Sequence, residues 1–341
     1  MSTSKKNNSK EFNADLANHS LSPLWEKLSS LVPSEPEALA EPYHWPYKTL
    51  RPLLSTACDL ITAQEAERRV LIFENPSLNS SARISDTLYS GLQVVLPGEI
   101  APLHRHSQGA LRCVLEGAGA YTIVNEQRTY LERGDFIINP SWAWHEHGNS
   151  SNEPIVWLDG LDLPIVNSLC ASFFQAKPNE LPSHKSTIDA TPNSDATNIA
   201  VRRPRTSNRI INYKYSRTRA TLSFMADSVQ IDDWEGHVVR YLDPVYGGWA
   251  LPTMAAQLQL LPAGFETKPL RSTASRVFAV IEGSGTTRIG NFEASWEEND
   301  VIVAPAWQKV QHLASKKAVL FEFSDRAAQE GLELYREERL N

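Results

Sequence analysis

The histidine pair His104-Arg105-His106 constrains the fold more than any other feature of the sequence. Because one residue separates the two histidines, a β-strand would point both imidazole rings to the same face, about 7 Å apart along the strand. Short β-branched and aromatic runs, punctuated by Gly, Pro or Asn, surround the pair and are typical of closely spaced strands. A barrel of such strands can bring a third histidine, His145, opposite the first two. The pattern predicts an all-β domain with a three-histidine metal site.

The spacing around these histidines resembles the cupin superfamily. The first cupin motif is matched at four positions: Gly98, His104, His106 and Gly117. The second motif is also matched at four positions: Gly134, Pro140, His145 and Asn149. Ala110 stands where the first motif usually has a Glu, and Trp142 stands in a glycine position of the second. Without the Glu, a bound divalent ion keeps its full charge and several open positions, and imidazole suits Fe, Zn, Ni and Cu alike. Such a site favours an anionic chelating substrate.

The chain more specifically resembles the gentisate 1,2-dioxygenase group of bicupins, which includes salicylate and 1-hydroxy-2-naphthoate dioxygenases. Five stretches carry the resemblance: residues 67–76, 88–93, 97–112, 132–135 and 142–149. The resemblance implies Fe(II), molecular oxygen and an aromatic substrate whose carboxylate and adjacent hydroxyl chelate the iron. The ring would open between the two carbons that bear those groups, so that gentisate would give maleylpyruvate. We therefore expect an extradiol-type ring-cleaving dioxygenase.

Two arginines are candidates for binding the substrate carboxylate. Arg112 lies six residues after His106, and an even offset across a tight turn can return it to the same lumen. The resemblance implies that Arg112 and Arg68 bind the carboxylate or stabilise the pocket, with Arg112 also taking part in catalysis. A guanidinium suits this role because it pairs with a carboxylate through two hydrogen bonds. The alternative, in which either arginine only pairs with an acidic residue such as Glu67 or Glu116, remains open.

Further candidates come from the same stretches. His147 lies two residues beyond the third histidine, and an ordinary pKa of about 6.5 suits a general acid or base. An orienting role for His147 is equally compatible with the sequence. The resemblance places Gln108 and Tyr89 near the substrate ring. Trp142 and Trp144 could wall that ring or belong to the core.

The second half of the chain reads as a degenerate copy of the first. Alignment on a shared Glu-Gly places Leu270 and Ser272 where the first half has its histidine pair. Alignment on a shared Pro and Trp places Val310 where the third histidine would be. None of these three side chains can serve as an imidazole ligand. His312, the counterpart of His147, is expected to be structural. We therefore predict a bicupin of two double-stranded β-helix (jelly-roll) barrels with peripheral helices and one active site.

The predicted domains follow from these motifs and from composition. They are an N-terminal tail with a short helix (1–40), the metal-binding cupin (41–175), a Ser-, Thr- and Pro-rich linker (176–209) and the metal-free cupin with a C-terminal helix (210–341). Residues 1 to about 12 are expected to be disordered. Four helices are expected: residues 24–31 capped by Ser22, a helix capped by Thr62 with Glu65 completing a capping box, residues 217–226, and residues 325–339 capped by Asp325.

The composition of the chain argues against some classes of binding partner. A formal net charge of -7 over 341 residues, without a basic stripe, argues against nucleic acid or an anionic membrane as the main partner. Three cysteines without paired spacing indicate reduced thiols, and no apolar leader or membrane span is visible. We expect a cytoplasmic enzyme that binds a small aromatic hydroxy acid and O2. The resemblance implies a homo-oligomer, with a tetramer suspected.

Other functions remain as alternatives. A Zn- or Mn-dependent cupin isomerase or hydrolase is disfavoured, because such cupins usually keep the Glu that Ala110 replaces. A metal-free binding or storage bicupin would have lost its histidines in both halves, whereas only the second half has lost them. Within the dioxygenase interpretation, the substrate remains open among gentisate, substituted gentisates, salicylate and 1-hydroxy-2-naphthoate.

Overall fold

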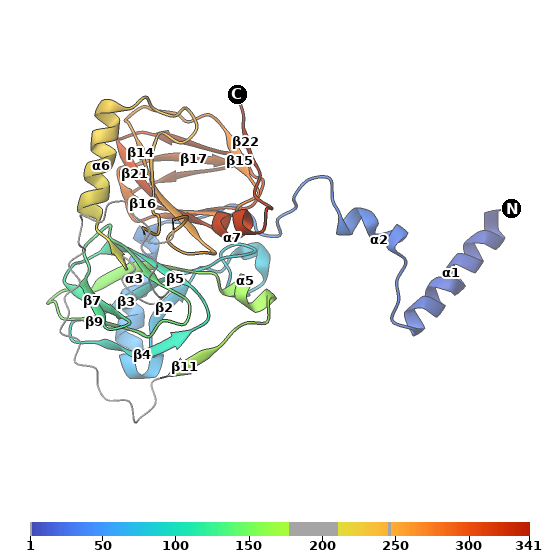
Figure 1. Ribbon diagram of the computed structural model, residues 1–341, viewed down its shortest axis with the longest axis horizontal. Coiled ribbons are helices and arrows are strands. Elements are labelled where there is room, and N and C mark those ends of the chain that lie inside the picture. The colour runs from blue at the N-terminus through green and yellow to red at the C-terminus, as the bar shows by residue number, and fades with distance from the viewer. Residues whose placement is uncertain (1, 177–210, 245–246) are drawn as a thin grey trace. The chain divides into compact units, whose positions relative to one another are not determined.

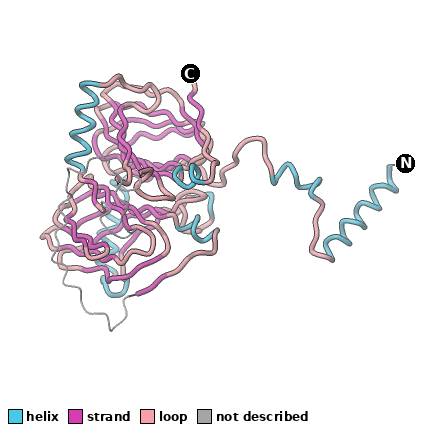
Figure 2. Tube along the Cα trace, viewed as in Figure 1, coloured by secondary structure: helices cyan, strands magenta, loops and turns pink. Residues whose placement is uncertain are grey.

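Antiparallel β-sheet makes up most of the regular structure in this computed structural model, which describes residues 2–176, 211–244 and 247–341 (Figure 2). The chain divides into two units, residues 1–37 and 38–341. Apart from Ala176, the predicted linker lies outside the described residues. None of the helices in the described part of the chain is long and apolar enough to cross a membrane.

The first unit contains two helices, α1 (Ser2–Asn18) and α2 (Leu24–Leu31). The expectation of disorder at the N-terminus was wrong, because α1 covers those residues; Lys, Glu, Ala and Leu in this stretch favour a helix. Helix α2 has the predicted bounds, but its predicted cap was wrong. Pro23 takes the N-cap position in an extended conformation, with no side-chain hydrogen bond, so Ser22 lies one residue too early.

Figure 1 shows the first barrel mainly in blue and green. It consists of two sheets, with strand orders β12-β8-β5-β10-β3-β2 and β11-β4-β9-β6-β7. Its strands are β2 (Arg69–Ile72), β3 (Tyr89–Val95), β4 (Ile100–His106), β5 (Ala110–Glu116), β6 (Ala120–Val124), β7 (Gln127–Tyr130), β8 (Phe136–Asn139), β9 (His145–Asn149), β10 (Ile155–Leu161), β11 (Phe174–Ala176) and β12 (Asn212–Tyr213).

The second barrel repeats this plan, with strand orders β1-β19-β16-β21-β14-β13 and β18-β17-β20-β15-β22. Its strands are β1 (Tyr43–Trp45), β13 (His237–Arg240), β14 (Ala255–Leu261), β15 (Leu270–Ser272), β16 (Arg276–Glu282), β17 (Gly285–Ile289), β18 (Phe292–Trp296), β19 (Val301–Ala304), β20 (Val310–Ala314), β21 (Ala318–Ser324) and β22 (Glu337–Arg339). The predicted all-β bicupin fold is confirmed.

Short helices lie outside the sheets, as expected: α3 (Tyr47–Leu60), α4 (Ala63–Ala66), the 3-10 turn η1 (Pro76–Leu78), α5 (Leu163–Ser168), α6 (Tyr215–Ser228) and α7 (Arg326–Gly331). The capping box of Thr62 and Glu65 on α4 is confirmed, as is a helix over residues 217–226. The predicted C-terminal helix was too long. It ends at Gly331, because the last residues pair as β22 with β15, which satisfies their backbone groups within a sheet instead.

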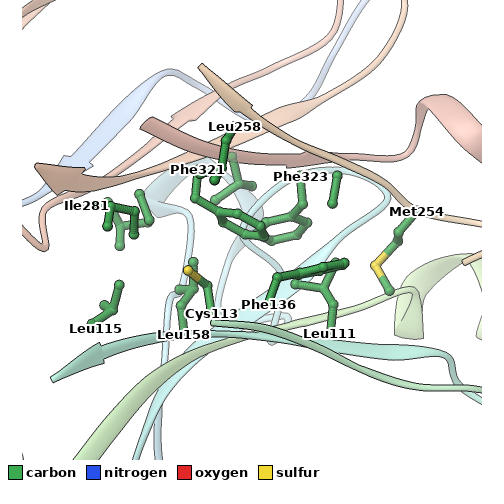
Figure 3. Close-up of a cluster of buried hydrophobic side chains, with 14 of the residues drawn as sticks. Leu111, Cys113, Leu115, Phe136, Leu158, Met254, Leu258, Ile281, Phe321 and Phe323 are labelled. Atoms are coloured by element: carbon green, nitrogen blue, oxygen red, sulfur yellow. The ribbon is translucent and has the colours of Figure 1, made fainter. Parts of the chain in front are cut away.

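The largest sheets of the two barrels share one apolar core. Figure 3 shows side chains of the first barrel meeting those of the second: Leu111, Cys113, Leu115, Phe136 and Leu158 on one side, and Met254, Leu258, Ile281, Phe321 and Phe323 on the other. All of these side chains are buried. Burial of this much apolar surface favours a rigid pairing of the barrels, so the metal-binding strands rest on a fixed base.

Each half of the chain also contributes an edge strand to the barrel of the other half. Strand β1 precedes the first barrel in sequence but pairs with β19 of the second, with Tyr43 opposite Val303. Strand β12 follows the first barrel, leads into the second half, and pairs with β8 of the first, with Asn212 opposite Ile137. The two halves of the chain are therefore interlocked by reciprocal edge strands.

The helices that follow these strands bond to both barrels. In α3, the Tyr47 amide donates to Asp300 of the second barrel at 2.7 Å, and the Tyr47 hydroxyl donates to Glu116 of the first at 2.5 Å. In α6, Tyr215 does the reverse, with its amide donating to Asp135 at 2.9 Å and its hydroxyl to Glu282 of the second barrel at 2.5 Å. The internal duplication thus extends to individual hydrogen bonds.

A buried carboxyl group at this junction predicts a pH-dependent stability. Thr253 donates to Asp162 at 2.5 Å, and burial raises the pKa of Asp162 to about 6. Since an unfolded Asp has a pKa of about 3.9, its ionisation opposes folding: the cost is small below about pH 4, grows as pH rises and is complete above about pH 6. Asp162→Asn cannot ionise. Urea unfolding gives the free energy of unfolding of this variant and of the parent chain at each pH. The advantage of the variant should be about 2 kcal/mol larger at pH 7.5 than at pH 4.5. An equal difference at both pH values would contradict this origin.

Candidate metal centre

Two neighbouring strands bring the three predicted histidines together. Strands β4 and β9 pair in antiparallel register with His104 opposite His145, and His106 shares the face of His104. One ring nitrogen from each of the three histidines lies within 4.8 Å of the others. The three histidines predicted from their spacing therefore form a cluster, and the strand register explains why His145 is the third member.

Backbone carbonyl groups fix the orientation of all three rings. The Nδ1 atoms lie 2.7 Å from the carbonyl oxygen of Pro102 for His104, 2.9 Å from that of Gln108 for His106, and 2.9 Å from that of Ala143 for His145. Each carbonyl requires a proton on Nδ1, which leaves the Nε2 lone pair for a ligand.

Burial keeps these rings neutral. It lowers the pKa of His104 to about 3 and that of His106 to about 4, and it lowers the pKa of His145 well below its ordinary value. The Nε2 atom of His145 is buried and has no hydrogen-bond partner among the described residues. An unpaired lone pair in a buried site is costly, and three neutral imidazoles converging on one point fit a divalent transition metal.

His147 lies next to this cluster on β9, with its ring centroid 5.6 Å from that of His145. The Thr122 hydroxyl oxygen lies 2.6 Å from Nδ1 of His147 and 3.2 Å from the Glu146 carbonyl oxygen, so this contact fixes the orientation of the ring. Burial, followed by the charge of Arg112, lowers the pKa of His147 well below its ordinary value. The ring is consequently neutral, and its Nε2 atom has no hydrogen-bond partner among the described residues. A role for His147 as a general acid or base stays a prediction.

Arg112 forms a buried ion pair that the sequence did not reveal. Its Nε lies 3.0 Å from Oδ1 of Asp159, directly across the β5–β10 pairing, so the partner is neither Glu67 nor Glu116. Burial outweighs the mutual attraction, because it lowers the pKa of Arg112 and raises that of Asp159. The Nη1 group of Arg112 is buried without a hydrogen-bond partner in the described residues, so it retains a donor for a ligand.

The remaining candidates lie around the cluster. Arg68 is partly buried, its Nε has no partner among the described residues, and burial lowers its pKa. Tyr89 opens β3, and burial raises its pKa. Gln108 donates to Ser172 at 2.8 Å and supplies the carbonyl that orients His106. Whether these three side chains bind a substrate stays a prediction.

One residue beside the cluster, Phe174, was not predicted from the sequence, and the two tryptophans left open there lie elsewhere. Phe174 on β11 pairs with His106 and stacks on the ring of His104 at 5.8 Å. Its pairing with β4 could not be predicted, because β11 is only three residues long and follows a loop. Trp142 and Trp144 do not pack on the histidine face; both stack on the guanidinium of Arg105.

The second barrel has other side chains at the positions that correspond to the histidine cluster. Leu270 pairs with Val310 in the way that His104 pairs with His145. Arg276, which corresponds to Ala110, forms a two-fold hydrogen-bonded ion pair with Glu322 at 2.9 and 2.7 Å. His312 is buried and keeps a 2.7 Å contact with Thr287, so the His–Thr pair belongs to the barrel and is not by itself a catalytic signature. That this barrel binds no metal stays a prediction.

Comparisons with known proteins agree with this geometry. A family model described as a cupin domain matches residues 91–161. The gentisate 1,2-dioxygenase 1 of Aquipseudomonas alcaligenes is 44% identical over 333 residues, covering 97% of this chain and 96% of that protein. The 5-aminosalicylate 1,2-dioxygenase of a Comamonas species is 34% identical and covers 95% of this chain and 88% of its own.

A solved structure extends the similarity to three dimensions. The salicylate 1,2-dioxygenase of Pseudoaminobacter salicylatoxidans, crystallised as an adduct with gentisate, superposes with a TM-score of 0.85. It is 30% identical in sequence, and the match covers 97% of this chain and 94% of that one. The whole described body of the chain therefore has a counterpart of the same architecture.

Proposed function

This chain belongs to the family of gentisate 1,2-dioxygenases, and from that premise we propose that it opens the ring of gentisate (2,5-dihydroxybenzoate) with O2 to give maleylpyruvate. Cleavage falls between the carbon bearing the carboxylate and the adjacent carbon bearing the hydroxyl group, and both oxygen atoms enter the product. The observation that carries this proposal is the buried three-histidine cluster, in a chain 44% identical to a gentisate 1,2-dioxygenase over nearly its full length.

We propose Fe(II) as the metal. His104, His106 and His145 would hold it through Nε2, since their Nδ1 atoms face backbone carbonyl groups. The chemistry that iron supplies when bound is the reaction of dioxygen with an aromatic ring. Three neutral ligands leave room for a bidentate anion, which makes the substrate's own carboxylate and hydroxyl oxygens suitable completing ligands.

The protein side chains then bind the substrate and accept its proton. Arg112 and Arg68 provide the positive charge that a carboxylate requires in a buried site, and the unpaired Nη1 of Arg112 provides a donor. Nε2 of His147, neutral and oriented by Thr122, accepts the proton of the substrate hydroxyl group. Tyr89 and Gln108 border the ring and contribute to substrate choice.

Other ring substituents define a second group of candidate substrates. The relatives include a 5-aminosalicylate 1,2-dioxygenase and a 1-hydroxy-2-naphthoate 1,2-dioxygenase. Their substrates share a carboxylate next to a hydroxyl group and differ elsewhere on the ring. Salicylate and 1-hydroxy-2-naphthoate therefore remain alternatives to gentisate, whereas an isomerase or hydrolase has no support in these comparisons.

The test is oxygen uptake by the chain reconstituted anaerobically with Fe(II). After addition of gentisate and air, we expect one O2 consumed per gentisate and a near-ultraviolet absorbance from the ring-opened product. Salicylate and 1-hydroxy-2-naphthoate, assayed in parallel, define the substrate range by their kcat/KM values. If iron binds but none of the three substrates consumes oxygen, the proposed reaction is refuted.

The cellular setting is also a proposal. We propose a cytoplasmic homo-oligomer, and the family resemblance implies a tetramer. Free thiols at Cys58, Cys113 and Cys170 support a reducing compartment. Large apolar side chains are exposed within the second unit, including Leu60 (74%) and Phe224 (67%), and these suit contact with another copy. Light scattering of the purified chain measures its oligomeric state.

A further inference from the structure

Arg105 lies between the two metal-binding histidines of β4 but on the other face of the strand. Its guanidinium carbon is 4.4 Å from the ring of Trp142 and 4.6 Å from that of Trp144, so two indole rings hold it. Its Nε and Nη2 atoms donate to Gln175 on β11, at 2.8 and 2.6 Å. A guanidinium held by two aromatic rings and by two hydrogen bonds to one amide oxygen has little freedom to move.

The two tryptophans belong to the turn that leads into His145. Within that turn, the Trp142 amide donates to the His106 carbonyl at 2.8 Å, and the Ala143 carbonyl orients the ring of His145. Arg105 therefore joins the strand that carries two of the histidines to the turn that orients the third.

The backbone of this turn is strained. Trp142 has a φ of 61°, in the left-handed region that favours glycine, and it occupies a position where the cupin motif has glycine. A non-glycine residue in such a conformation costs on the order of 1–3 kcal/mol and persists only where its surroundings enforce it. Here the enforcing contacts are the amide bond to His106 and the stack on Arg105.

The second barrel provides an internal comparison. Its Arg271 lies 4.4 Å from the ring of Trp307, which also has a positive φ of 64°. Lys309 stands where the first barrel has Trp144, so the turn of this barrel carries one indole ring instead of two. The second indole ring is thus found in the barrel whose histidines converge.

We propose that Arg105 with Trp142 and Trp144, here called the arginine clamp, is a positioning device for the metal centre. The clamp holds the turn before His145 against β4, so that the three Nε2 atoms stay at the spacing required by one ion. It touches neither metal nor substrate, and it acts through the strand and the turn. The inference builds on the proposed metal site but does not depend on which substrate is cleaved.

The test is the rate at which the metal is lost to a chelator. Full-length chains loaded anaerobically with Fe(II), and in parallel with Co(II), are mixed with excess chelator, and release is followed by absorbance without any substrate. Arg105→Leu and Trp144→Lys, the latter reproducing the second barrel, should release metal about 10 to 100 times faster than the parent chain. Trp144→Phe keeps an aromatic face and should restore slow release.

Arg271→Leu is the matched control, because it removes the corresponding stack from the second barrel. Melting temperatures of the metal-free proteins accompany each release rate. Comparable losses of melting temperature in Arg105→Leu and Arg271→Leu, with faster release only in the former, would establish the clamp as a positioning device. Unchanged release from Trp144→Lys, or equal acceleration by Arg271→Leu, would overturn the proposal. A chain that retains metal normally but fails to cleave gentisate would refute the proposed reaction and leave the clamp standing.

Discussion

Replacement of His145 by alanine is expected to abolish metal retention and to reduce turnover below detection. Loss of an outer partner of a metal ligand typically costs 10- to 100-fold in affinity or activity, and His145 would itself be a ligand, so its loss should cost more. The change also removes the buried Nε2 atom that has no partner among the described residues. Metal content is measured by elemental analysis after dialysis, and turnover by oxygen uptake. His104→Ala is expected to behave in the same way.

His312→Ala is the control for this experiment. His312 is also buried and bonds a threonine, but it lies in the barrel whose corresponding positions hold leucine and valine. Its replacement should lower stability while leaving one metal ion per chain and normal turnover. If all three alanine variants lost metal to the same extent, the model of a single site would be wrong.

The second large effect is expected from removing the positive charge of Arg112. The single change Arg112→Leu is difficult to interpret, because it leaves Asp159 buried without its partner, which typically costs 3–5 kcal/mol of stability. The double variant Arg112→Leu with Asp159→Asn removes both charges and keeps an acceptor for the Trp157 indole, which donates to Asp159 at 3.2 Å. Its stability should remain close to that of the parent chain.

The kcat/KM of the double variant for gentisate should fall about 10- to 100-fold, since a charge-assisted bond to a buried carboxylate is worth about 1.5–3 kcal/mol. Arg112→Lys keeps the charge but loses the guanidinium fork. Its kcat/KM should lie between those of the parent chain and the double variant. Asp159→Asn alone controls for the loss of the carboxylate. A double variant with unchanged kcat/KM would remove Arg112 from the substrate site.

The sequence predicted those parts of the site that depend on local spacing. His104 and His106 had to share a face because a strand alternates its side chains, and the cupin spacing indicated His145. Asp159 was not predictable in this way. It faces Arg112 only because β10 pairs with β5 in one particular register, and nothing local to either residue specifies that register.

The fold shows the same limit. Period-two patterns and glycine turns predicted the two barrels, and the capping box predicted α4. At the C-terminus, a stretch rich in helix-forming residues becomes β22, because pairing with β15 outweighs its intrinsic preference. The strands β1 and β12 are too short to carry a pattern of their own, so their exchange between barrels arises only from tertiary contacts.

That exchange has a consequence for synthesis on the ribosome. His44 in β1 bonds Asp300, a residue 256 positions later in the chain. At typical elongation rates, β1 must wait roughly 10 to 50 s after leaving the ribosome before its partner strand exists. The second barrel therefore cannot complete its sheet until β1, synthesised much earlier, pairs with it. Until then β1 is an unpaired strand, so its pairing with β19 must follow the synthesis of most of the chain.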